Sequence, residues 1–64
     1  MVNYKGYEIT WAALGGGEVL EARLWSPPIF IMLGLPPDGL TAKFVIEAQM
    51  RVLIDLAEAK RGEK

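Results

Sequence analysis

The sequence predicts an α+β fold in which one long C-terminal helix covers a three-stranded antiparallel sheet. Two runs of alternating apolar and polar residues predict strands around 4–14 and 18–26. An apolar run between two Pro-Pro pairs predicts a third strand around 29–35, and helical periodicity predicts the helix at 41–61. Because the connections are short, we expect a β-β-β-α meander that forms one domain over residues 1–64.

The first two strands form a hairpin whose register is set by its side chains. A two-residue loop over the first two residues of Gly15–Gly17 places Trp11 opposite Leu20 and Glu8 opposite Arg23. Apolar residues then pair with apolar ones on one face, and the charged pair lies on the other, whereas a three-residue loop would set apolar residues opposite charged ones. Two glycines also suit the positive φ angles of a type I′ turn. We expect the two-residue loop; a four-residue loop of the same parity is the alternative.

The third strand is apolar on both faces. It lies between Pro27-Pro28 and Pro36-Pro37, and prolines cannot donate hydrogen bonds to a sheet. As the last strand of a meander it forms an edge, and native proteins cover or pair an exposed apolar edge. This strand is therefore expected to meet another subunit.

The predicted helix has a narrow polar stripe, formed by Lys43, Glu47, Arg51, Asp55 and Glu58. Their spacing predicts a solvated ladder of ion pairs. Most of the remaining circumference is apolar, which is wider than the stripe of roughly 100° that suffices to cover a sheet. Either Asp38 or Thr41 is expected to cap the N-terminus, and Gly62 stands where a C-terminal glycine belongs.

Chain length and composition favour self-association. A chain of 64 residues buries only about 60% of its unfolded surface, and this one has no cysteine for a disulfide and no histidine. Its apolar fraction of 52% is high for so small a monomer. We expect a homodimer or a higher oligomer, through the third strand, the helix or both. The expected interface residues are Ile29, Phe30, Ile31, Met32, Leu33, Phe44 and Ile54.

Charge and residue types argue against several functions. The net charge of −1 gives no electrostatic reason to expect nucleic acid or an anionic membrane as partner. The longest uncharged stretch, 24–37, is short and broken by prolines, and the N-terminal residues do not resemble a signal peptide. A cytoplasmic protein is expected. Without histidine or cysteine, we expect no catalytic residues, no metal and no cofactor.

One surface could still bind a ligand. Tyr4, Arg23 and Trp25 are expected on the outer face of the sheet, where the aromatic rings could stack on a nucleobase. The alternative for Trp25 is packing against the adjacent prolines or a second subunit. We favour this alternative because little positive charge surrounds the rings.

Part of the chain resembles a known fold. Tyr4–Ile9, Trp11-Ala12 and Ile54-Asp55 are similar to small bacterial β-β-β-α proteins, and loosely to the HicB antitoxin fold, a relative of the double-stranded-RNA-binding domain. The resemblance implies this fold and a dimer. The chain departs from the pattern in its more apolar third strand, and it carries no DNA-binding segment after the helix.

The sequence therefore predicts a small non-enzymatic interaction or regulatory module that binds itself and, by the same surface, another protein. One alternative is a nucleic-acid-binding module that uses the outer sheet face. Another is a small oligomeric enzyme or ligand carrier with a pocket between subunits, which would require Asp38 or a buried carboxylate in that pocket.

Overall fold

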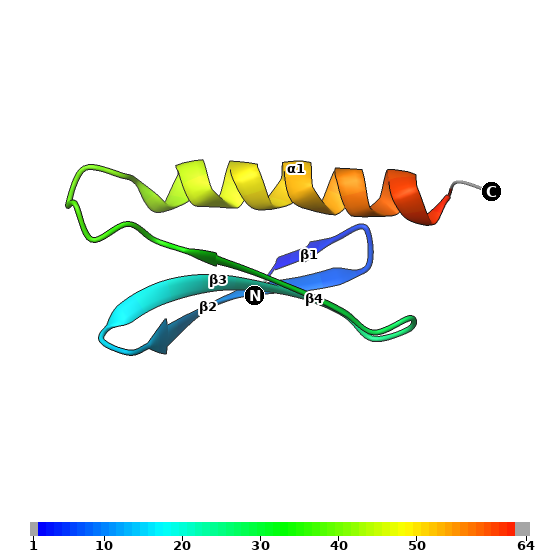
Figure 1. Ribbon diagram of the computed structural model, residues 1–64, viewed down its shortest axis with the longest axis horizontal. Coiled ribbons are helices and arrows are strands. Elements are labelled where there is room, and N and C mark those ends of the chain that lie inside the picture. The colour runs from blue at the N-terminus through cyan, green and yellow to red at the C-terminus, as the bar shows by residue number, and fades with distance from the viewer. Residues whose placement is uncertain (1, 63–64) are drawn as a thin grey trace.

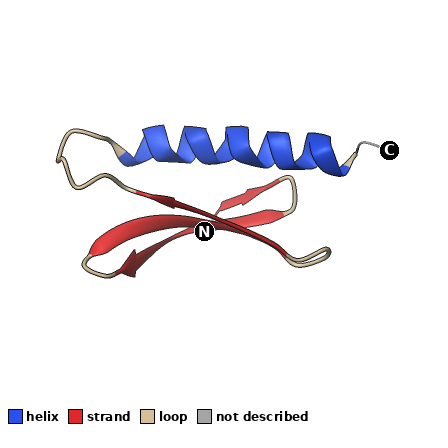
Figure 2. Cartoon of the chain, viewed as in Figure 1, coloured by secondary structure: helices blue, strands red, loops and turns tan. Residues whose placement is uncertain are grey.

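A four-stranded antiparallel sheet and one helix form a two-layer α+β fold (Figures 1 and 2). The computed structural model describes residues 2–62. The helix lies along one face of the sheet, and no other element of the described residues covers the opposite face. The strand order is β1-β2-β3-β4, so β1 and β4 are the edges. The elements are β1 (Val2–Tyr4), β2 (Tyr7–Leu14), β3 (Gly17–Leu24), β4 (Ile29–Gly34) and α1 (Lys43–Arg61).

The prediction of three strands was wrong because the first predicted strand contains a tight turn. Lys5 and Gly6 have positive φ angles of 51° and 87°, and the chain reverses there. Tyr4 consequently pairs with Tyr7, and β1 runs back along β2. Glycine adopts a positive φ readily, whereas such an angle in Lys5 is uncommon for a residue with a side chain.

The β2–β3 hairpin has the predicted two-residue loop. Leu14 pairs with Gly17 and Trp11 with Leu20, and the intervening Gly15 and Gly16 both have positive φ angles. One face of the sheet therefore carries the buried residues of both strands, Tyr7, Ile9, Leu20 and Ala22, and the helix packs on that face. The predicted register of the hairpin is confirmed.

The core lies between the helix and the inner face of the sheet. The helix packs mainly on β3 and β4. Residues on successive turns of one helix face meet alternating residues of the central strands. The buried core consists of Tyr7, Ile9, Leu20, Ala22, Ile46, Met50 and Ile54.

Neither predicted residue caps the N-terminus of α1. The helix begins at Lys43, and Ala42 in the N-cap position offers no side-chain hydrogen bond. Asp38 instead accepts hydrogen bonds from the backbone N–H groups of Leu40 and Thr41 and from the Thr41 hydroxyl. These bonds close the β4–α1 loop. At the other end, Gly62 has a right-handed φ of −78° rather than a left-handed one.

Candidate interaction surface

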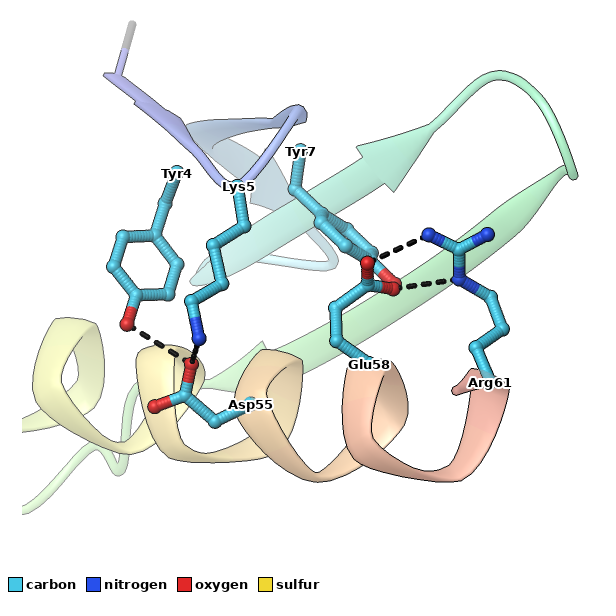
Figure 3. Close-up of polar contacts among 6 residues, drawn as sticks. All are labelled: Tyr4, Lys5, Tyr7, Asp55, Glu58 and Arg61. Atoms are coloured by element: carbon cyan, nitrogen blue, oxygen red, sulfur yellow. Dashed lines mark hydrogen bonds and ion pairs between the residues drawn. The ribbon is translucent and has the colours of Figure 1, made fainter. Parts of the chain in front are cut away.

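The polar stripe of α1 points toward β1 and β2, where it bonds to side chains of the sheet. Asp55 accepts a hydrogen bond from the Tyr4 hydroxyl at 2.9 Å and pairs with the Lys5 ammonium at 2.6 Å (Figure 3). The bonds from Lys5 and Tyr4 hold the pKa of Asp55 below its usual value. The hydrogen bond to Asp55 likewise raises the pKa of Lys5.

Glu58 makes the next contact along the helix. Its carboxylate accepts a hydrogen bond from the Tyr7 hydroxyl at 2.9 Å and a bidentate pair from the Arg61 guanidinium (Figure 3). The hydrogen bond from Arg61 is the main reason that the pKa of Glu58 is lowered. Burial raises the pKa of Tyr7, whose ring lies in the core while its hydroxyl reaches this carboxylate.

Two further contacts extend the same row to the start of the helix. The Trp11 indole N–H donates to Glu47 at 3.0 Å, and Lys43 pairs with Glu18 at 2.9 Å. We call this row of helix residues (Lys43, Glu47, Asp55, Glu58) and its sheet partners the polar seam. The predicted ladder along the helix was wrong: among residues 2–62, no ion pair joins Arg51 to its acidic neighbours.

The other flank of the helix, toward β4, is apolar and open. A groove of about 310 Å³ lies there between the helix and the sheet, lined by Leu33, Gln49, Val52 and Leu53. Val52 and Leu56 are 57% and 60% exposed. At 100° per residue, Leu56 lies between Val52 and Leu53 around the helix. We call this surface (Gln49, Val52, Leu53, Leu56 and the edge of β4) the apolar flank.

The predicted interface residues differ in the face of the sheet or helix on which they lie and in how far they are exposed. Phe30 and Met32 lie on the outer face and are 48% and 42% exposed, and Phe44 on the helix is 70% exposed. Ile29, Ile31 and Leu33 are half-buried against the core. Ile54 was wrongly assigned, because the sheet of its own chain buries it completely.

β4 exposes unpaired backbone groups at the edge of the sheet. The Leu35 N–H donates to the Glu18 carbonyl at 2.9 Å, which makes these residues a hydrogen-bonded pair at the end of the β3–β4 ladder. Antiparallel ladders alternate between hydrogen-bonded and non-hydrogen-bonded pairs. The N–H and C=O groups of Phe30, Met32 and Gly34 therefore point away from β3, toward the open edge.

The predicted ligand face is divided between two sides of the sheet. Tyr4 lies opposite Tyr7 and points toward the helix, where it bonds to Asp55. The tight turn before β2 gives Tyr4 this face. Arg23 lies 5.0 Å from the Trp25 ring centroid and 5.1 Å from that of Phe30. The predicted trio thus does not form one platform.

A second groove lies beneath the polar seam, between α1 and the β1–β2 side of the sheet. It measures about 390 Å³, and its lining includes Ile9, Trp11, Leu20, Glu47 and Arg51. The Glu47 carboxylate is held by the Trp11 indole. This groove belongs to one chain, unlike the pocket between subunits expected for an oligomeric enzyme.

The acidic residues that the structure describes do not gather at one site. Asp38, required by the enzyme hypothesis, is exposed and bonded within its own loop. Within residues 2–62, no polar or charged residue is buried and no three acidic side chains cluster to hold a metal ion.

The chain matches no family model, no curated protein and no solved structure. The resemblance to the HicB fold therefore stays a prediction. Over the described part of the chain, no helix combines the length and apolar character needed to cross a membrane.

Proposed function

We propose that this protein is a small non-enzymatic interaction module that works as a homo-oligomer. The observation that carries the proposal is the contrast between the two flanks of the helix. On one flank, the residues of the polar seam are satisfied by contacts within the chain. The other flank exposes apolar side chains beside an unpaired strand edge. Such a surface is typical of protein association sites.

The extent of the surface also supports association. A compact protein of 7.1 kDa is expected to expose roughly 4,100 Å², and this chain exposes 4548 Å². Its radius of gyration is 12.4 Å, compared with about 10.7 Å for a compact domain of this length. One helix on one sheet leaves more surface uncovered than a chain of this size usually has.

The oligomer is tested by sedimentation equilibrium of the unmodified chain at micromolar concentrations. We expect a mass of at least twice 7.1 kDa, with the fraction of oligomer rising with concentration. A mass of 7.1 kDa throughout, with a cooperative melt of a folded monomer, would refute the proposal.

A ligand carrier is the second candidate, favoured by the groove beneath the polar seam. Its apolar walls and the Arg51 guanidinium suit a small apolar molecule with an acidic group, such as 8-anilinonaphthalene-1-sulfonate. In a Trp25→Phe variant, Trp11 is the remaining tryptophan and reports on the groove. Saturable quenching of Trp11 that Arg51→Gln weakens would support this function, and absence of quenching would exclude the groove for such ligands.

A further inference from the structure

The open edge of β4 and the apolar flank of α1 lie on the same side of the molecule. The groove lined by Leu33, Gln49, Val52 and Leu53 joins them. The polar seam lies on the opposite flank, toward β1 and β2. A partner that paired with β4 would therefore meet the helix at the same time.

We propose that the partner at this surface is a second copy of the chain, whose β4 pairs antiparallel with the first around a two-fold axis at Ile31. This inference rests on the proposed homo-oligomer and specifies its interface. The two sheets join into one, and the two α1 helices lie antiparallel on the same face. Strand and helix then form a single interface.

The backbone of β4 permits this pairing. Phe30 and Met32 direct their N–H and C=O groups to the open edge, and a two-fold axis at Ile31 makes each of them the hydrogen-bonded partner of the other in the second copy. The same axis places Ile31 opposite the partner's Ile31 in a non-hydrogen-bonded pair. Antiparallel symmetry of this kind is typical of homodimers.

The side chains select this register over the neighbouring one. With the axis at Ile31, Phe30 meets the partner's Met32 on the outer face, a favourable contact between sulfur and an aromatic ring. On the inner face, Ile29 meets the partner's Leu33. An axis at Met32 would instead set Phe30 opposite the partner's Gly34, which has no side chain to cover the ring.

The distance between the two helices also fits this dimer. Neighbouring strands are about 4.8 Å apart, so β4 lies about 2.4 Å from the axis. Because α1 packs on β3 and β4, its axis lies about 5 Å from the two-fold. The two helices are then about 10 Å apart, close to the 8–10 Å at which packed helices lie.

The helix segment nearest the axis follows from the direction of the chain. α1 runs antiparallel to β4 (Figure 1), and Leu33 shares its groove with Leu53. Ile31 lies about 6.6 Å further along the strand, which corresponds to about four helix residues. Leu56 therefore lies near the axis, and the two copies of Leu56 cover each other.

Single cysteines test the pairing directly, because the chain has none of its own. In the proposed dimer, the two Cα atoms of residue 31 are about 4.5 Å apart, within the range of a disulfide. Those of residue 32 are about 7–8 Å apart, beyond that range. We expect Ile31→Cys to form a disulfide-linked dimer on mild oxidation, and the matched Met32→Cys and Asn3→Cys variants to stay largely uncoupled.

A second variant covers the case that Ile31→Cys fails to fold. Ile29→Cys/Leu33→Cys places two cysteine pairs across the axis, and the same pairing predicts a doubly linked dimer. Preferential coupling of Met32→Cys would overturn the proposed register. Failure of folded Ile31→Cys and of the double variant to couple, while the unmodified chain sediments as a dimer, would overturn the β4 interface and leave the homo-oligomer standing. A monomeric unmodified chain would overturn both.

Discussion

Replacing Leu56 with glutamate should separate association from folding. The Leu56 side chain is 60% exposed in one chain, so the change removes little packing within that chain. Leucine and glutamate are similar helix formers, and exposed substitutions usually change the free energy of unfolding by less than about 0.5 kcal/mol. In the proposed dimer, however, two carboxylates would face each other near the axis.

The size of the effect follows from the exposed fraction. Complete burial of a leucine side chain is worth about 1.5–3 kcal/mol, so covering the 60% that is exposed contributes about 1–2 kcal/mol per copy. The two copies together lose about 2–4 kcal/mol of the free energy of dimerisation. This loss raises the dissociation constant by about 30-fold or more. Charge repulsion and desolvation of the carboxylates add to this loss.

Sedimentation equilibrium measures the dissociation constant, and circular dichroism checks that the helix remains. The matched control is Leu14→Glu, because Leu14 is 59% exposed at the tip of the β2–β3 hairpin, far from the axis. We expect Leu56→Glu to be a folded monomer and Leu14→Glu to dimerise normally. Equal dimerisation of both variants would refute the assignment of the apolar flank.

Three further predictions concern stability. Met50→Ala should lower the free energy of unfolding by about 2–5 kcal/mol in denaturant titration, because Met50 is fully buried; a loss below about 1 kcal/mol would contradict its place in the core. Gly6→Ala should cost about 1–2 kcal/mol because of its φ of 87°, and Gly34→Ala, where an added Cβ meets open space, should cost less; equal costs would argue against the turn. The pKa of Asp55 is lowered on folding from its ordinary 3.8, so its stabilisation is present above that pH and is lost as the pH falls through the folded value. In Asp55→Asn, the free energy of unfolding should therefore fall less steeply as the pH is lowered. An unchanged dependence on pH would exclude the contacts with Lys5 and Tyr4.

Much of the sheet could be predicted from side-chain alternation. In the β2–β3 hairpin, Trp11 pairs with Leu20 and Glu8 with Arg23, so one register was favoured and proved correct. The additional strand was missed because Lys5-Gly6 is a weaker turn signal than two glycines. The turn shifts the alternation by one residue, so that Tyr4 and Tyr7 share a face. The three residues of β1 are too few for that shift to be visible in the sequence.

The polar seam could not be predicted from the helix alone. Glu47, Asp55 and Glu58 have the spacing of an ion-pair ladder, and local spacing gives no information on long-range partners. The sequence indicates these contacts through three aromatic residues, Tyr4, Tyr7 and Trp11. Each has an apolar ring with a polar group at its tip, and such a group finds a hydrogen-bond partner when the ring packs. With these contacts made, Ile54 faces the core and is fully buried.

The most direct test of the β4 interface is backbone amide hydrogen exchange of the unmodified chain at several concentrations. The N–H groups of Phe30, Met32 and Gly34 point away from β3, so they should exchange fast when the chain is dilute. We predict that protection of Phe30 and Met32 rises as the dimer forms, while the outward amide of Asn3 in β1 stays unprotected. Fast exchange at Phe30 and Met32 in a sample that is fully dimeric would contradict the pairing of β4 with the partner's β4.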